Sequence, residues 1–337
     1  MNPLLVNGDS YMQNFTVKTA KTATSLKAFM SGLIDYAGLF PPANLPLDQA
    51  IKNYVHYRES DQRWMLSRFI VPTSRLEEVS TQDLFRQSAE PFHFSVIGHS
   101  GKENFLASVV KNLHAVSAFR QRHGTAVTAD VFEVPLPIAI LFESRPRAWA
   151  VLATIHSQLE TVGGIRTYFE VPAGPAWLEM MSRLVDTIAE FNLARGTDMG
   201  FKLRCGGVKA TDFPPSTKLA MALLRCRDAG IALKATAGLH HPIRRFDRSV
   251  QTTMHGFLNV FGAGILAYVH RLDAATTRAI LDDENADNFR FTDAAFSWHD
   301  FVASADQITT VRQKALISYG SCSFEEPYQD LQAMGVM

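Results

Sequence analysis

Strand-like and helix-like segments alternate along most of this chain, and no other feature of the sequence constrains its fold as strongly. Short segments rich in β-branched and aromatic residues are each followed by an amphipathic segment with helical periodicity. Such alternation is typical of a parallel sheet, and a count of eight strands favours a single (β/α)8 TIM barrel of the α/β class. The eight strands are predicted at residues 33–40, 65–72, 92–100, 127–137, 165–175, 199–205, 231–237 and 289–298, with a closing helix at 304–318.

A doubly wound open sheet is the alternative architecture. The two nucleotide-binding motifs common in such sheets, GxGxxG after the first strand and GxxxxGK[ST], do not occur in the chain. No low-complexity linker divides the sequence, which favours one domain over residues 24–337. Residues 1–23 are polar and aperiodic, and we expect a flexible extension there. The C-terminal segment from residue 317 is expected to pack across the barrel or to form a subunit contact.

Charge and cysteine content limit the range of partners and compartments. The 33 basic and 33 acidic residues cancel without forming blocks, so neither nucleic acid nor an anionic membrane surface is an expected partner. No apolar run approaches the roughly 18 residues that a membrane span requires. Three cysteines without CxxC spacing, and no secretory signal pattern at the N-terminus, favour a cytoplasmic protein with reduced thiols.

The segment from residue 200 to residue 242 carries the densest chemical signal. Lys202 and Arg204 alternate with apolar residues on one predicted strand, and Lys234 does so on the next. A cation on an otherwise apolar strand is costly to bury unless it has a partner or a function. Both strands end in glycine turns, at 206–207 and 237–238, where backbone can approach a ligand. This pattern predicts a ligand site at the carboxyl ends of adjacent parallel strands.

Acidic side chains occupy matching positions on two earlier strands. The string Phe-Glu-Val-Pro occurs twice and places Glu133 and Glu170 at equivalent heights on the fourth and fifth strands. In a barrel, charges at strand ends gather at the catalytic mouth. The alternative for the glutamates is a buried ion network with the basic residues, and for Arg68 and Asp35 a structural brace. The residues expected to bind substrate are Arg204, His240, His241, Arg68 and Asp35.

The placement of the two lysines resembles that of class I aldolases of the deoxyribose-phosphate aldolase type. The resemblance is limited to Lys202 and Lys234 within the sixth and seventh strands and to the small turn that follows Lys234. It implies a Schiff-base lyase without a cofactor, in which Lys202 is the nucleophile and Lys234 the cation that lowers its pKa. Glu170 or Glu133 would then transfer protons at the adjacent carbon.

Two other functions remain open from the sequence. In the first, the basic residues clamp a small anionic substrate, while Glu133, Glu170 and His240 or His241 hold a divalent metal or transfer protons, as in a hydrolase or isomerase. In the second, the barrel is a non-catalytic binding or assembly protein whose mouth is closed by its own ion pairs. Small molecules are the expected ligands, and a homo-oligomer is possible.

Overall fold

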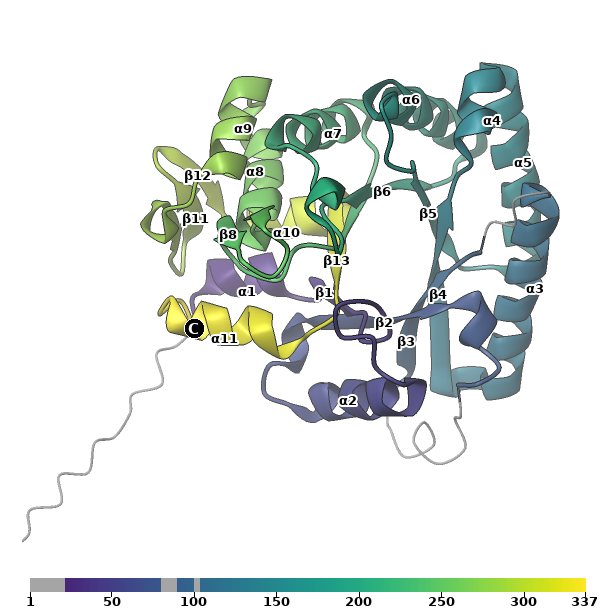
Figure 1. The fold of residues 1–337 in the computed structure, drawn as a ribbon, viewed down its shortest axis with the longest axis horizontal. Coiled ribbons are helices and arrows are strands. Elements are labelled where there is room, and N and C mark those ends of the chain that lie inside the picture. Colours follow the sequence, from purple (N-terminus) through teal and green to yellow (C-terminus); the bar gives the residue numbers. More distant parts are fainter. Residues whose placement is uncertain (1–21, 80–89, 100–103) are drawn as a thin grey trace, which may run out of the picture.

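The computed structural model describes residues 22–79, 90–99 and 104–337. Eight parallel strands close into one barrel in the order β1-β13-β7-β6-β5-β4-β3-β2, and helices surround it (Figure 1). The predicted (β/α)8 barrel is therefore confirmed. The barrel strands are β1 (Ile34–Tyr36), β2 (Leu66–Pro72), β3 (Phe92–Ile97), β4 (Val127–Pro135), β5 (Arg166–Glu170), β6 (Gly200–Arg204), β7 (Leu233–Thr236) and β13 (Leu316–Ser321).

The helices begin and end where local sequence signals place them. Ser304 and Gln307 form a capping box at the start of α10, and α7 ends at Gly230, which has a left-handed φ of +66°. The helices are α1 (Thr24–Met30), α2 (Leu47–Glu59), α3 (Phe105–His123), α4 (Ile138–Glu143), α5 (Arg145–Val162), α6 (Trp177–Arg195), α7 (Ser216–Ala229), α8 (Phe257–His270), α9 (Ala274–Asp282), α10 (Ala305–Lys314) and α11 (Glu325–Ala333).

The prediction for the eighth strand is wrong. Residues 289–298 lie outside the barrel, where β10 (Phe289–Phe291) and β11 (Ala295–Trp298) form an antiparallel sheet with β12 (Phe301–Ser304). The strand that closes the barrel is β13, whose residues were expected to continue the closing helix or to form a C-terminal cap. A further hairpin, β8 (Arg245–Asp247) with β9 (Thr252–Met254), follows β7.

The cause of this error is visible in the two segments. The segment from Phe289 to Trp298 has the alternation of one strand, but residues 292–294 reverse the chain and its two halves pair with each other. The segment from Leu316 directly follows an amphipathic helix, and neither glycine nor proline marks the boundary. Periodicity alone does not decide which of two such strands joins a barrel, because that choice depends on contacts with β1 and β7.

Two separate apolar clusters hold the barrel. The large one fills the space between the strands and the surrounding helices. The small one consists of Val131, Tyr168 and Ala232, with Ile317 packed against it. Val131 and Tyr168 stand two residues before Glu133 and Glu170 on their strands, so they share the inner face with those glutamates. This small cluster therefore lies inside the barrel beside the charged groups, apart from the large outer cluster.

Only one of the two predictions for the chain ends falls on described residues. The expected extension at residues 1–23 lies almost entirely outside the described residues, which begin at residue 22. At the other end, Phe324 is buried against Tyr57 of α2, with ring centroids 5.0 Å apart, and α11 continues from it (Figure 1). No helix in the described part of the chain has the length and apolar character needed to cross a bilayer.

Candidate active site

Three charged residues stand in one row across adjacent barrel strands. Glu170 on β5 is in register with Lys202 on β6, and Lys202 is in register with Lys234 on β7. All three side chains are buried, while Phe201 and Leu203 pack in the outer apolar cluster. The predicted alternation of β6 therefore sends Lys202 into the barrel and its apolar neighbours toward the helices.

Lys202 lies between two carboxylates. Its Nζ is 2.7 Å from Oε2 of Glu133 and 3.1 Å from Oε2 of Glu170. The second oxygen of Glu170 accepts a hydrogen bond from Nε of Arg204 at 2.8 Å. The predicted convergence of basic residues from β6 with acidic residues from β4 and β5 is thus present in the structure.

Lys234 occupies a deeper part of the same network. Its Nζ is 2.7 Å from Oδ2 of Asp35 and 2.8 Å from Oε1 of Glu133, so Glu133 bridges the two lysines. Ser95 and Ser318 complete this part of the site, and sequence reasoning did not identify them. Ser95 donates to Glu133 at 2.6 Å and accepts from Lys234 at 3.2 Å, and Ser318 donates to Asp35 at 2.6 Å. The only sequence signal that could have pointed to these two residues is a serine at an alternating position of a buried strand.

The pKa values of the two lysines are raised, whereas the sequence predicted a lowered pKa for Lys202. Burial alone disfavours the charged form of Lys202, but contacts with Glu133 and Glu170 raise its pKa above the ordinary value. Burial acts in the same way on Lys234, and Asp35 and Glu133 raise its pKa. The expected lowering of the Lys202 pKa by a neighbouring cation is therefore wrong for the unliganded protein. The carboxylates between the lysines outweigh the repulsion between them.

The pKa values of the two glutamates move in the opposite direction. Burial raises the pKa of Glu133, but the nearby Lys202 and Lys234 outweigh it and hold that pKa far below its ordinary value. Burial also raises the pKa of Glu170, whereas Lys202 and Arg204 lower it. At neutral pH the network therefore holds alternating positive and negative charges that neutralise one another.

A cavity of about 450 Å³ opens above this network at the carboxyl ends of the strands. Among the charged residues of the network, Lys202, Glu170 and Arg204 line it, while Lys234, Glu133 and Asp35 do not. The glycine turns form part of its wall: a Cβ atom on Gly238 would lie only 2.8 Å from Cα of Gly206. The other lining residues include Pro41, Pro42, Ile70, Ile97, Pro135, Thr236, Gly320, His240 and Cys322.

The two histidines after β7 have different surroundings. His240 lines the cavity, and its Nδ1 lies 3.3 Å from Oε2 of Glu326. His241 contacts Oδ2 of Asp330 at 2.7 Å through Nδ1 and lies 2.7 Å from the guanidinium of Arg245 through Nε2. His240 is therefore positioned where a substrate in the cavity could contact it. His241 instead links the loop after β7 to α11.

Arg68 is held at a distance from the cavity. Its guanidinium forms two hydrogen bonds with the carboxylate of Asp130 on β4, at 2.8 and 2.7 Å. Its backbone N–H donates to Asp35 at 2.9 Å. Neither Arg68 nor Asp35 lines the cavity, and their side chains do not form an ion pair with each other: the guanidinium of Arg68 pairs with Asp130 and the carboxylate of Asp35 with Lys234. Their contact with substrate stays a prediction.

The donors proposed for a divalent metal are not gathered into one set of ligands. Within residues 22–79, 90–99 and 104–337, no three His, Cys, Asp or Glu side chains are arranged to hold a metal ion. Both glutamates contact lysine ammonium groups, and each histidine contacts an acidic residue of α11. A metal at these positions would have to displace existing ion pairs.

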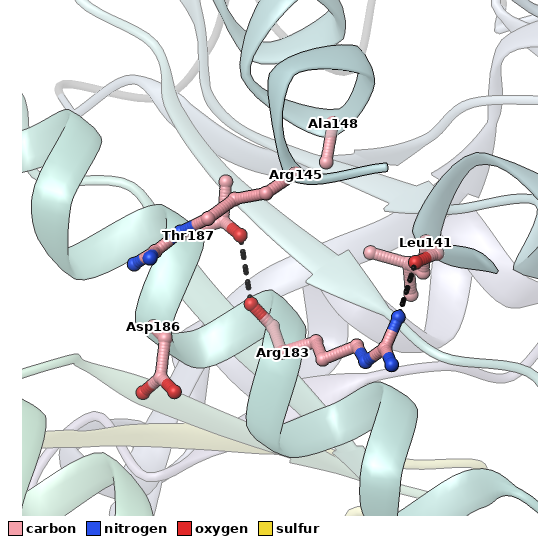
Figure 2. A pocket seen from close by; sticks show the side chains of 6 residues that line it. All are labelled: Leu141, Arg145, Ala148, Arg183, Asp186 and Thr187. Carbon is pink, nitrogen blue, oxygen red and sulfur yellow. Dashed lines mark hydrogen bonds between the residues drawn. The ribbon is translucent and has the colours of Figure 1, made fainter. Parts of the chain in front are cut away.

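A second hollow lies on the outer surface, between α4, α5 and α6. It measures about 300 Å³ and is lined by Leu141, Arg145, Ala148, Arg183, Asp186 and Thr187 (Figure 2). Arg183 donates to the carbonyl oxygen of Leu141, and the hydroxyl of Thr187 donates to the carbonyl oxygen of Arg183. Arg145 is paired with Glu190. Asp186 is paired with Arg225. The charged groups of this groove thus have partners on the protein, and none of its lining residues lines the cavity at the barrel mouth.

Comparison with known proteins adds little to this description. No protein-family model matches the chain, and no curated protein matches it. Among solved structures, a GH6 enzyme of Orpinomyces sp. Y102 aligns with 66% of this chain and 73% of its own, at 12% identity and a TM-score of 0.35.

Proposed function

We propose that this protein is a lyase that acts on a small anionic carbonyl compound at the mouth of the barrel, with Lys202 as the Schiff-base nucleophile. The single observation that carries the proposal is the position of the Lys202 ammonium group. It lies between two carboxylates and lines a cavity of about 450 Å³. An amine on the floor of an open cavity, with proton acceptors in contact, has the components that imine formation requires.

The cavity also favours catalysis over the non-catalytic barrel. That alternative expected the mouth to be closed by its own ion pairs. The ion pairs are present, but they form the floor of the cavity and leave its volume open. Burying several charges at the mouth of an open cavity costs stability, and such sites are commonly retained for function.

Lys202 must lose a proton before it can attack a carbonyl carbon, and Glu170 is the acceptor that also faces the cavity. Transfer within this contact converts an ion pair into a neutral amine and a neutral acid. Burial disfavours the charged forms of both partners, but their mutual contact and Arg204 outweigh it and hold the ion pair together, so a change in these contacts is needed for the transfer. An anionic substrate group that binds Arg204 would compete with Glu170 for the guanidinium and raise the proton affinity of Glu170.

The reaction then follows from the positions of these groups. Nζ of Lys202 adds to the carbonyl carbon, Glu170 gives its proton to the departing hydroxyl group, and loss of water leaves a protonated imine and the Glu170 carboxylate. Glu170 removes the proton of a hydroxyl group on the β carbon, the bond between the α and β carbons breaks, and an aldehyde leaves. The remaining enamine takes a proton at its carbon, and water hydrolyses the imine to release the second product and free Lys202.

Borohydride reduction tests the covalent step directly. The protein is incubated with a panel of small aldehydes and 2-keto acids, reduced, and analysed by intact mass and peptide mapping. We expect one adduct per chain on the peptide that carries Lys202. Lys202→Met should abolish it, whereas Lys218→Met, a change on the surface of α7, should leave it unchanged. Labelling of surface lysines alone, or equal labelling of the Lys202→Met protein, would contradict the proposal.

The raised pKa values of both lysines favour a second candidate function. If Lys202 stays an ammonium group during turnover, it stabilises a developing oxyanion while Glu170 moves a proton, as in an isomerase. This protein would exchange a substrate C–H proton with deuterium oxide but give no reduced adduct. Exchange together with an adduct at Lys202 would favour the lyase.

A further inference from the structure

A second group of reactive side chains lies in the wall of the mouth and takes no part in the proposed lyase reaction. Cys322 follows β13 and His240 follows β7, which are adjacent strands, and both residues line the cavity. Sγ of Cys322 is 3.8 Å from Nδ1 of His240. Glu326, at the start of α11, places Oε2 3.3 Å from the same nitrogen. Thiol, imidazole and carboxylate therefore form one cluster at the cavity.

The geometry of the cluster places a proton on Nδ1 of the imidazole. A protonated Nδ1 can donate to both the carboxylate and the sulfur, whereas an unprotonated Nδ1 would face the lone pairs of Glu326. Burial of the ring lowers the pKa of His240, but the contacts with Cys322 and Glu326 outweigh it and raise that pKa to about 10. At neutral pH an imidazolium therefore stands beside the sulfur of Cys322, and a neighbouring cation stabilises a thiolate.

We propose that Cys322 is the site at which small electrophiles that enter the mouth modify this protein covalently, with His240 as the residue that keeps its sulfur in the thiolate form. With a haloacetamide, the sulfur forms a bond to the methylene carbon while the bond from that carbon to the halogen breaks. The halide leaves with the bonding electrons, and the thiol proton goes to solvent. The step requires no oxidant and no other reactant.

The other two cysteines provide internal controls. Cys205 and Cys226 are completely or almost completely buried. Burial raises the pKa of Cys205 to about 12 and also raises that of Cys226 well above its ordinary value. Neither lines the mouth cavity. In the folded protein both should react far more slowly than Cys322.

The adduct would have a consequence for the site described above. Cys322 and Lys202 line the same cavity, so an acetamide group on the sulfur occupies part of the space that a carbonyl substrate needs. We expect alkylated protein to give less of the reduced Lys202 adduct. This consequence rests on the proposed lyase activity, but the rate of alkylation does not and is measured without any turnover assay.

Iodoacetamide is the probe. Folded protein is treated with it between pH 5 and pH 10, and each cysteine peptide is quantified by mass spectrometry against N-acetylcysteine. An ordinary thiol with a pKa near 8.5 is only a few per cent ionised at pH 7. We expect Cys322 to react about tenfold faster than N-acetylcysteine at pH 7. Cys205 and Cys226 should stay unlabelled.

His240→Asn should lower the rate at pH 7 about tenfold. His241→Asn, which changes the adjacent ring that contacts Asp330 instead of Cys322, should leave the rate unchanged. Should His240→Asn fail to fold by circular dichroism, Glu326→Gln serves in its place and should slow the reaction at pH 8, where the ring then loses its proton. The proposal is overturned if Cys322 reacts no faster than N-acetylcysteine, or if neither variant changes its rate.

Discussion

The two lysines of the barrel stand at register-paired positions on adjacent strands, yet they lie in different environments. Lys202 contacts the cavity on one side and two glutamates on the other. Lys234 is enclosed by Asp35, Glu133 and the hydroxyl of Ser95, and it does not reach the cavity. One position is open to a ligand and the other is sealed.

This difference shows that burial of a cation does not decide whether a ligand can reach it. Both ammonium groups are buried, and the pKa of both is raised by carboxylates. What separates them is access to a volume that a substrate can occupy. Lys234, Asp35 and Ser95 form the sealed half of the network. They hold Glu133 in place, and Glu133 in turn holds Lys202 at the cavity floor. The predictions that follow test this division of the network.

The largest effect is expected for Glu133→Gln. The two oxygens of Glu133 contact one lysine each, so the substitution leaves two buried ammonium groups short of a counter-charge. Breaking a buried ion pair from one side costs about 3–5 kcal/mol. Urea denaturation should show this loss. Glu170→Gln is the matched control and should cost less, because its site faces the cavity and water can enter. Equal losses would argue against a sealed half.

Replacing the lysines compares the halves directly. Lys234→Met leaves Asp35 and Glu133 as neighbouring buried anions, and we expect it to cost about 3 kcal/mol of unfolding free energy. Lys202→Met should cost less, since Arg204 still contacts Glu170. Both values come from denaturation curves fitted with a common slope. A larger loss for Lys202→Met would reverse the assignment of the two halves.

Acid should weaken the same network. Burial raises the pKa of both glutamates, but their cationic neighbours hold each value below the ordinary 4.5 of the unfolded chain. Below 4.5 the unfolded state binds protons that the folded state does not, so this stabilisation is complete above 4.5 and is lost as the pH falls. Urea midpoints at pH 6, 4.5 and 3 should decrease, and Glu133→Gln should reduce the slope. Parallel curves for both proteins would contradict this.

The smallest effect is expected in the outer groove. Glu190 pairs with Arg145 there, but about half of each side chain is exposed. Exposed ion pairs contribute between zero and about 1 kcal/mol, so Glu190→Ala should change the unfolding free energy by less than about 0.5 kcal/mol. Thermal melts of the Glu190→Ala and Glu133→Gln proteins would compare the two losses of stability. A loss above 2 kcal/mol would show that the groove contributes as much as the barrel interior.

Much of the barrel was predictable from local sequence. Seven strands were placed correctly because each is a short apolar segment between an amphipathic helix and a turn. The eighth was misplaced because the segments from Phe289 and from Leu316 have similar local patterns. Only pairing with β1 and β7 distinguishes them.

The site was predictable to a similar extent. Alternation along β6 and β7 and the repeated Phe-Glu-Val-Pro string identified Lys202, Lys234, Glu133 and Glu170, which the structure brings into contact. The expected equal height of the two glutamates is wrong, because Glu133 is in register with Tyr168 and Glu170 with Pro135. Ser95, Ser318 and the pairing of Cys322 with His240 had no distinctive pattern in the chain. Their roles depend on which side chains meet across the barrel interior.

The order of residues by itself determined that the charged groups share one face of their strand and the apolar residues the other, because a strand alternates its side chains between two faces whatever its partners are. The tertiary structure decided the rest. Barrel closure set the depth of each side chain, and depth determined that Lys202 reaches the cavity while Lys234 is enclosed. It also surrounded both lysines with carboxylates, which is why their pKa values rise where two adjacent cations alone would have lowered them.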